Sequence, residues 1–452
     1  MTDTGSIATR RTVDVQWLIN ARPLSPYQWG IVAMCFLIVL LDGLDTAAMG
    51  FIAPALVRDW GVPSASLGPV MSAALAGMIF GALGSGPLAD RFGRKTVLCV
   101  SVAVFGGFSL WSAFATGIDQ LVLLRFLTGL GLGAGMPNAT TLLSEYTPEK
   151  VKSLLVTTMF CGFNLGMAGG GFLSAAIIPH WGWHSLLLIG GIVPMLLLPV
   201  LLFWLPESAR FMVVRGQPVE RIRKVLQPVA RESLAGVEQF TIPGQQAGGK
   251  GPRGPVLARM FAGGLGPGTL LLWGTNFMGL IIIYLLTSWL PTLMRESGAS
   301  MTQSAVVGAL FQFGGVLSAV GVGWAMDRGN PHKVIGICYL LAGVLAVAVG
   351  HSMGSGLALV LLVLLAGMCI NGAQSAMPSL AARYYPTHVR ATGVSWMLGI
   401  GRFGAVLGAW LGAALLGLGW NFEQVLTVLI VPAVLAMTGV FVKGRISHTD
   451  AS

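Results

Sequence analysis

Twelve apolar stretches, each long enough to cross a lipid bilayer, dominate this sequence of 452 residues. A bilayer core about 30 Å thick requires roughly 20 apolar residues per helix, and in lipid only a helix or a closed barrel satisfies every backbone polar group. The pattern therefore predicts an all-α membrane protein with twelve transmembrane helices. Their expected limits are 28–56, 67–89, 96–117, 120–142, 154–178, 184–205, 269–294, 302–326, 333–352, 356–380, 390–418 and 424–443.

The composition excludes several other classes of protein. Only 10% of the residues are charged, against about 25% in an average soluble domain, so a soluble enzyme is excluded. The five cysteines stand singly in apolar stretches and the six histidines are dispersed along the chain. Neither a disulfide framework nor a metal site is therefore predicted, and no organic cofactor is expected.

A polar segment after the sixth stretch divides the helices into two equal sets. The expected domains are an N-terminal segment at 1–27, a six-helix bundle at 28–205, a central loop at 206–268, a second six-helix bundle at 269–443 and a tail at 444–452.

The positive residues predict the orientation of the chain. Of the 27 Lys and Arg residues, 23 lie in the termini and in the loops on the same side, nine of them in the central segment. Because loops rich in Lys and Arg stay in the cytoplasm, we expect both termini there, in a multi-pass protein of the cell (inner) membrane. This bias accounts for the net charge of +10 without a nucleic-acid partner.

The two halves of the chain repeat each other. Residues 53–61, after the first stretch, match residues 290–298 at an offset of 237. Residues 146–152, after the fourth stretch, match residues 384–390 at an offset of 238. Two six-helix parallel repeats are the plan of transporters whose halves rock around a site near the membrane midplane.

Two motifs connect this plan to a known family. The loop G-P-L-A-D-R-F-G-R-K at 86–95 resembles the signature between helices two and three of the major facilitator superfamily. The D-G-L-D of Asp42 to Asp45 resembles the aromatic acid:proton symporter family in particular, and P-E-S-A-R at 206–210 and Arg125 also fit that family.

The resemblance implies the major facilitator fold and import of 4-hydroxybenzoate, protocatechuate or benzoate, with a proton as the coupling ion. Two departures stand out. The second copy of the loop keeps Asp327 and Arg328 but loses the full glycine pattern. The fifth helix lacks the Gly-Pro pair typical of the superfamily's antiporters, which favours symport.

Asp42 and Asp45 are the candidate proton-coupling residues. Three residues apart on a helix, they project from one face. A carboxylate at the bilayer centre costs about 2.5–3.5 kcal/mol, and two like charges on one face disfavour each other's ionisation, so one of them could exchange a proton near neutral pH. The alternative is that one acid only neutralises Arg125.

Arg125 and Arg402 are the candidate partners of an anion, because a guanidinium stays charged when desolvated and binds a carboxylate with two N–H groups. In the repeat, Asn164 occupies the position of Arg402. We expect Arg402, which has no evident acid in its own half, to hold the substrate carboxylate and Arg125 to orient the acids. The alternative for Arg402 is snorkelling to the interface or a helix cap.

Further polar residues inside the spans are candidates for contact with the substrate. They are Asn164, Tyr284, Gln312, Asn371 and Gln374. The alternative is that these side chains only join helices to each other, as buried amides in membrane proteins often do.

A third group of residues is expected to control gating at the cytoplasmic ends of the helices, where contacts made in one state only shift the balance between open forms. These residues are Gly86, Asp90, Arg91, Gly93, Glu145, Asp327, Arg328, His332 and Arg390. For Glu145 a charge pair at the inner gate and a solvated loop end are both open.

The sequence thus favours a proton-coupled importer of aromatic carboxylates that works by alternating access. Two alternatives stay open: a proton-linked exporter of drugs or other organic compounds, and a sensor for aromatic acids that does not transport. The expected partners are the small aromatic carboxylate, protons and membrane lipid, and the expected state is a monomer.

Overall fold

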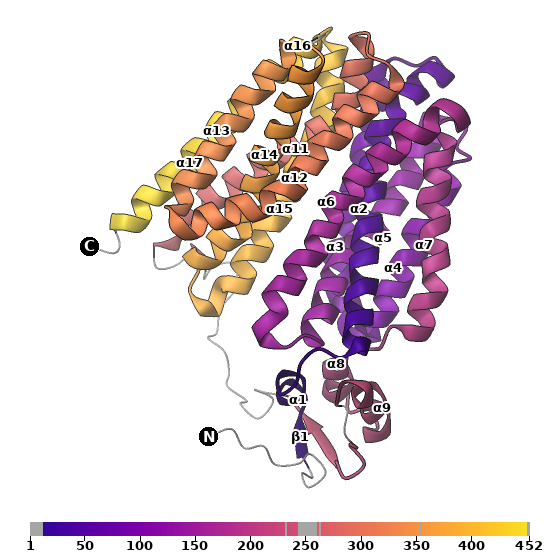
Figure 1. The fold of residues 1–452 in the computed structure, drawn as a ribbon, viewed down its shortest axis with the longest axis vertical. Coiled ribbons are helices and arrows are strands. Elements are labelled where there is room, and N and C mark those ends of the chain that lie inside the picture. The colour runs from indigo at the N-terminus through magenta and orange to yellow at the C-terminus, as the bar shows by residue number, and fades with distance from the viewer. Residues whose placement is uncertain (1–11, 231–232, 243–259, 262–263, 353–354, 450–452) are drawn as a thin grey trace.

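The computed structural model describes residues 12–230, 233–242, 260–261, 264–352 and 355–449. Long helices form two bundles that lie side by side (Figure 1). The first bundle comprises α2 (Pro26–Trp60), α3 (Gly68–Phe92), α4 (Arg94–Ser112), α5 (Ile118–Glu145), α6 (Glu149–Trp181) and α7 (His184–Trp204). The second comprises α11 (Leu265–Glu296), α12 (Met301–Arg328), α13 (Pro331–Gly350), α14 (Leu357–Tyr384), α15 (Thr387–Gly417), α16 (Phe422–Val428) and α17 (Ile430–Thr449). The expected all-helical fold is confirmed.

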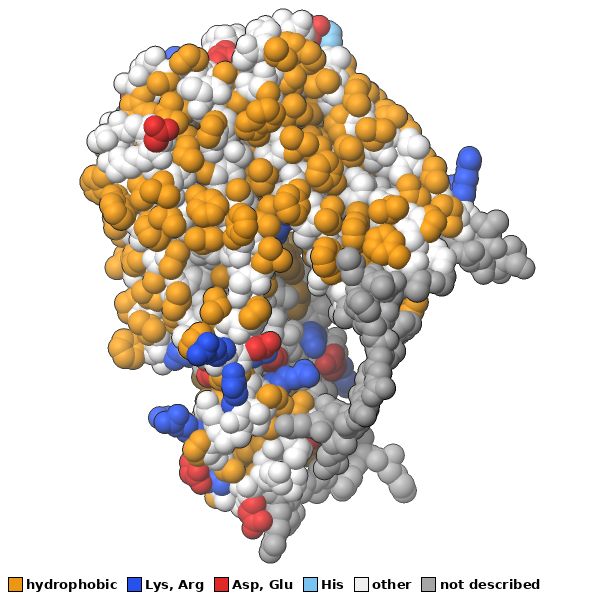
Figure 2. Space-filling model, turned by 180° about the vertical axis from the view of Figure 1, so that it is seen from behind, with side chains coloured by type: hydrophobic (Ala, Val, Ile, Leu, Met, Phe, Trp, Pro, Cys, Tyr) orange, Lys and Arg blue, Asp and Glu red, His pale blue; other side chains and the backbone are white. Residues whose placement is uncertain are grey.

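The lengths of these helices suit a membrane. Among the described residues, eleven helices are long and apolar enough to span one. The further long helix, α12, has 28 residues and therefore extends about 42 Å at 1.5 Å per residue, more than the bilayer core. Hydrophobic side chains cover the flank of the bundles, as Figure 2 shows, whereas most of the charged side chains in that view gather toward one end.

Local signals define the limits of the first long helix. Ser25 and Gln28 form a capping box, in which each side chain accepts a hydrogen bond from the other residue's backbone N–H. The helix ends at Gly61, whose φ of 64° is a left-handed conformation that glycine adopts without steric cost. α2 therefore begins two residues before the expected limit of 28 and ends four residues after the expected limit of 56.

Glycine contacts between helices recur in both bundles. A Cβ on Gly129 of α5 would collide with the backbone of Ala74 in α3. A Cβ on Gly367 of α14 would collide in the same way with the backbone of Phe311 in α12. Gly367 and Phe311 follow their counterparts by 238 and 237 positions, so the sequence repeat is also a repeat of helix packing. Small residues allow such close approach of helices in membranes.

A small folded unit, here called the inner cap, lies at one end of the first bundle (Figure 1). It consists of β1 (Thr12–Asp14), α1 (Val15–Asn20), α8 (Ala209–Val214), α9 (Val219–Ala230) and β2 (Gln239–Thr241). The two strands pair in parallel, with Val13 opposite Phe240, and both of these side chains are buried. Parts of the N-terminal segment 1–27 and of the central loop 206–268, which the sequence assigns to separate domains, come together in this unit. We call this end of the molecule the inner end.

The two bundles contact each other at the opposite, outer end. A Cβ on Gly50 in α2 would collide with the backbone of Thr287 in α11. Nearby, the hydroxyl of Ser64 in η2 (Ser64–Leu67) donates to the carboxylate of Glu296 at the end of α11. Toward the inner end the surface is hollowed between the bundles, as Figure 2 shows. The structure is therefore closed at its outer end.

Candidate functional site

Asp45 and Arg125 form a buried ion pair in the first bundle. Its side chain on α2 is 2% exposed, and that of Arg125 on α5 is 0% exposed. Arg125 Nη2 donates to Asp45 Oδ2, and Ser109 Oγ on α4 donates to Asp45 Oδ1 at 2.6 Å. Both oxygens of Asp45 are thus occupied, while Nε and Nη1 of Arg125 are buried without a partner in the described chain.

Asp42 is equally buried but bonded far less. Its Oδ1 accepts a hydrogen bond from Thr46 Oγ1, one turn further along α2, at 3.3 Å. Its Oδ2 has no hydrogen-bond partner among the described residues. Asp45, and not Asp42, forms the ion pair with Arg125, so one of the two acids does neutralise this guanidinium, as the alternative interpretation has it. A buried carboxylate with so few donors is costly to keep charged.

Arg402 connects the two bundles near Asp42. It is half-buried on α15, and its Nη1 donates to the carbonyl of Met78 on α3 at 2.9 Å. It lies close enough to Asp42 and to Tyr284 of α11 for its charge to act on both side chains. Within the described part of the chain its guanidinium makes no other hydrogen bond. It can therefore still offer a two-pronged contact to a carboxylate.

Two of the candidate amides in the second bundle bond to its helices. Gln374 accepts a hydrogen bond from Tyr339 Oη at 2.9 Å and donates to Asn276 Oδ1 at 2.6 Å. Asn371 donates to the carbonyl of Gly367, one turn earlier on α14, at 3.0 Å. Both amide atoms of Gln374 are occupied by contacts between helices, which supports the alternative that it only joins them.

Gln312 and Asn164 differ from these two amides. Gln312 on α12 is 1% exposed, and its Nε2 donates to Thr287 Oγ1 on α11 at 2.6 Å. Its Oε1 is buried and has no partner in the described chain. Asn164 is half-buried on α6, at the position that corresponds to Arg402 in the repeat. Gln312 thus keeps one hydrogen-bonding atom unused.

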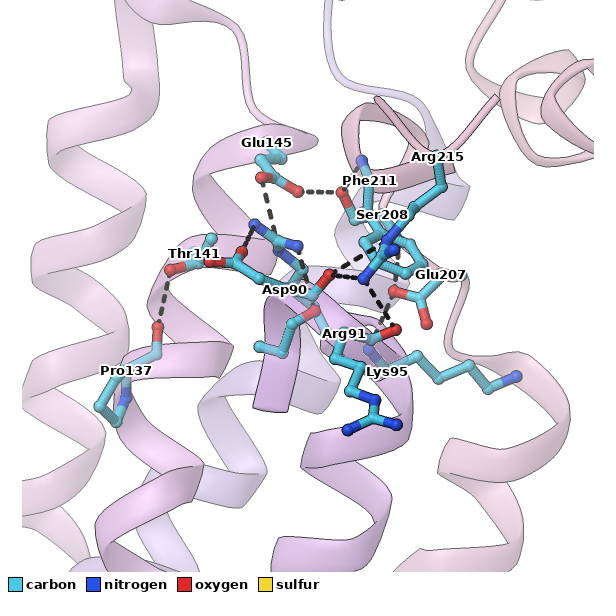
Figure 3. A network of polar contacts seen from close by, with 12 residues as sticks. Asp90, Arg91, Lys95, Pro137, Thr141, Glu145, Glu207, Ser208, Phe211 and Arg215 are labelled. Atoms are coloured by element: carbon cyan, nitrogen blue, oxygen red, sulfur yellow. Dashed lines mark hydrogen bonds and ion pairs between the residues drawn. The ribbon is translucent and has the colours of Figure 1, made fainter. Parts of the chain in front are cut away.

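A network of charges joins α3, α4 and α5 at the inner end, as Figure 3 shows. Arg94 Nη2 donates to Asp90 Oδ1 at 2.9 Å, and Arg94 Nε lies 3.9 Å from Glu145 Oε1. Glu145 also accepts a hydrogen bond from the hydroxyl of Ser208. The ends of these helices are therefore tied together in this state, and Glu145 is a member of the charge network rather than a solvated loop end.

Glu207, in the segment before α8, belongs to the same network and is not among the gating residues predicted from the sequence. Its Oε1 accepts hydrogen bonds from the backbone N–H of Lys95 at 3.1 Å and of Ser208 at 2.8 Å. Its carboxylate also packs against Gly93, where the φ of 97° and the lack of space both require glycine. The P-E-S-A-R motif was the only signal that pointed to this residue.

The remaining predicted gating residues of the first bundle lie at its surface. Arg215, just after α8, donates to the carbonyl of Asp90 at 2.7 Å and to that of Arg91 at 3.3 Å, so the inner cap binds the last turn of α3. The exposed Arg91 side chain lies over the ring of Phe92. Gly86 is exposed, and a Cβ there would meet nothing within 4 Å, so Gly86 has no close contact in this state.

Among the described residues, the gating candidates of the second bundle make contacts that differ from those of the first. Arg328 lies over the ring of Trp324, 4.3 Å from its centroid. His332 Nε2 lies 3.0 Å from Lys443 Nζ on α17, and Arg390 Nε donates to the carbonyl of Tyr385 at 3.3 Å. The side chain of Asp327 lies outside the described residues. The loss of the glycine pattern in this loop is consistent with the difference between the halves.

Comparison with known proteins identifies the family. A family model described as Major Facilitator Superfamily matches residues 35–244 and 272–449. The chain is 72% identical to the 4-hydroxybenzoate transporter PcaK of Pseudomonas putida, over 98% of each chain. It is 49% identical to a gallate transporter of Pseudomonas putida, over 96% of this chain and 95% of that one.

A solved structure shares the fold. It is the inward-open xylose transporter XylE from E. coli, with a TM-score of 0.71, 19% identity, and coverage of 91% of this chain and 95% of that one. The repeated helix packing, the site between the bundles and the matching family model agree. The chain belongs to the Major Facilitator Superfamily, and it is a transporter rather than an enzyme.

Proposed function

We propose that this chain imports an aromatic carboxylate of the 4-hydroxybenzoate type together with a proton. The names of its relatives supply the substrate class, since they transport 4-hydroxybenzoate and gallate. The observation that carries the proposal is the placement of Arg402 at the contact between the bundles, within electrostatic range of Asp42, whose Oδ2 has no hydrogen-bond partner among the described residues. Such a pair can bind an organic anion on one side and a proton on the other.

Arg402 is the proposed ligand of the substrate carboxylate. Arg125 is already in an ion pair with Asp45, whereas Arg402 has one hydrogen bond, to a neutral carbonyl. A desolvated guanidinium binds a carboxylate strongly through two parallel N–H donors.

Asp42 is the proposed proton carrier. It is buried with one long hydrogen bond, so the protonated carboxyl suits its surroundings better than the carboxylate does unless a cation is near. The charge of Arg402 is that cation. When a substrate carboxylate binds Arg402, it neutralises the charge that stabilises the Asp42 carboxylate, and Asp42 then binds a proton. Binding of the anion and binding of the proton are thereby coupled.

The orientation and state of the chain complete the proposal. The Lys and Arg bias of the loops supports a cytoplasmic inner end, with both termini inside and the protein in the inner membrane. The outer closure and the hollow toward the inner end then correspond to an inward-facing form. Import of a monoanion with one proton is electroneutral, so the pH gradient alone drives it. We propose a monomer in contact with lipid along the apolar flanks.

Uptake into membrane vesicles tests the proposal. Vesicles with an imposed alkaline interior should accumulate labelled 4-hydroxybenzoate, and a protonophore should abolish this accumulation. Arg402→Lys keeps the positive charge but loses the two parallel N–H donors of the guanidinium, so it should raise KM. Arg402→Ala should nearly eliminate uptake. The methyl ester should compete poorly with the acid.

Each other outcome selects a different function. Binding of 4-hydroxybenzoate without uptake would indicate a sensor. Loss of substrate from preloaded vesicles when the outside is acidified would indicate an exporter. Equal competition by the ester, or normal transport by Arg402→Ala, would overturn the assignment of the carboxylate to Arg402.

A further inference from the structure

Gln312 has a buried hydrogen-bond acceptor that nothing in the described chain satisfies. The side chain is 1% exposed, and Thr287 fixes its amide through the 2.6 Å bond to Nε2. Oε1 is left buried and unpartnered. Leaving such an acceptor unmade costs the desolvation of the group, so a native structure that keeps one calls for an explanation.

The surroundings of Gln312 place it at the contact between the bundles. One turn earlier on α12, Gly308 packs against Phe51 of the first bundle and against Pro291. Three residues later, Gly315 packs against the side chain of Asn371. The face of α12 that carries Gln312 is therefore packed against the first bundle, α11 and α14.

Thr287 relates Gln312 to the proposed substrate site. It follows Tyr284 by three residues on α11, which places it about 4.5 Å further along the helix, toward the outer end. Tyr284 in turn lies near Arg402 and Asp42. Because Gln312 is hydrogen-bonded to Thr287, it lies on the outer side of Tyr284.

The repeat shows that packing alone does not require a polar residue at this depth. The position equivalent to Gln312 in the first bundle is Leu75, at the offset of 237, and it is buried as well. Thr287 likewise corresponds to Gly50. The second bundle therefore has a hydrogen-bonded pair, Gln312 and Thr287, at the positions where the first bundle has Leu75 and Gly50.

We propose that Oε1 of Gln312 accepts a hydrogen bond from the ring hydroxyl of a para-hydroxylated substrate whose carboxylate is bound by Arg402. This assignment rests on the proposed function and extends it to the feature that separates 4-hydroxybenzoate from benzoate. Opening of the outer contact admits the substrate to Gln312, and closure then buries the oxygen together with a donor. A substrate without the hydroxyl leaves it unpaired.

Selectivity of the wild-type protein gives the first test. Vesicles that take up labelled 4-hydroxybenzoate are challenged with unlabelled benzoate, 4-methoxybenzoate and 4-hydroxybenzoate. Benzoate and 4-methoxybenzoate, which lack a hydroxyl donor, should need concentrations about tenfold higher or more to inhibit uptake equally. This is the loss expected for one missing hydrogen bond to a buried acceptor. Equal competition by 4-methoxybenzoate would overturn the proposal, because that compound has no O–H to donate.

Variants give the second test. Gln312→Leu and Gln312→Met should raise KM for 4-hydroxybenzoate about tenfold and leave KM for benzoate within a factor of two. Gln374→Leu is the matched control, because both amide atoms of Gln374 serve helix contacts, and it should affect the two substrates alike. Uptake of benzoate by each variant shows that it is folded.

The two proposals can fail separately. If wild-type vesicles accumulate neither acid, the proposed function fails. If they accumulate both acids and the Gln312 variants lose both in parallel, Gln312 has only a structural role and this inference is overturned.

Discussion

Asparagine substitutions at Asp45 and Asp42 should act differently: the first should lower stability strongly, and the second should uncouple transport from the proton at little cost in stability. Asp45→Asn removes the carboxylate from a fully buried pair and leaves Arg125 charged, with two further N–H groups already unpaired. Removal of one partner of a buried ion pair costs about 3–5 kcal/mol, which lowers the ratio of folded to unfolded protein by roughly a hundredfold or more. Asp42→Asn keeps an oxygen that can accept the hydrogen bond from Thr46 and removes a charge that forms no ion pair within the described residues, so its cost should be about 1 kcal/mol or less.

Two assays on purified, reconstituted protein separate these effects. Thermal unfolding should show a markedly lower midpoint for Asp45→Asn and a nearly unchanged one for Asp42→Asn. The double variant Asp45→Asn/Arg125→Gln should recover part of the loss, since it removes both charges. In proteoliposomes Asp42→Asn should exchange 4-hydroxybenzoate across the membrane but should not accumulate it under a pH gradient.

Three outcomes would contradict these expectations. An unfolding midpoint for Asp45→Asn equal to that of the wild type would show that the ion pair does not hold the first bundle together. Proton-driven accumulation by Asp42→Asn would show that Asp42 does not carry the coupling proton. Loss of exchange as well as accumulation in that variant would instead assign Asp42 to substrate binding.

Two further predictions concern the ends of the bundles. Gly50→Val should keep the outer end open, because a side chain at this position collides with the backbone of Thr287. A cysteine introduced at Ser64 as a reporter should then react more readily with an external thiol reagent. Gly30→Val is the control, because Gly30 lies in open space on the same helix. Gly93→Ala should lower the turnover rate more than it raises KM, since it displaces the Glu207 carboxylate from the inner network. Unchanged reactivity in the first case, or a pure change of KM in the second, would contradict the respective role.

The sequence was sufficient for the architecture because the signals involved are local or repeated. Hydropathy over about 20 residues predicts a spanning helix whatever surrounds it, since lipid leaves the backbone no other partner. The offset of 237 to 238 residues predicted the duplication of the bundle, and the glycine contacts of Gly129 and Gly367 repeat it in space. The same reasoning identified Asp42, Asp45 and the two arginines as the charges that a membrane interior must accommodate.

Tertiary structure decided which of these charges meet. Asp42 and Asp45 share one helix face, yet only Asp45 pairs with Arg125, because the rotation and spacing of α2 against α4 and α5 bring Ser109 and Arg125 to the same carboxylate. Glu207 had a motif but no visible partner, since Lys95, whose backbone N–H it accepts, lies 112 positions earlier in the chain. Pairing depends on distances between helices, and those distances are set by packing that no local pattern encodes.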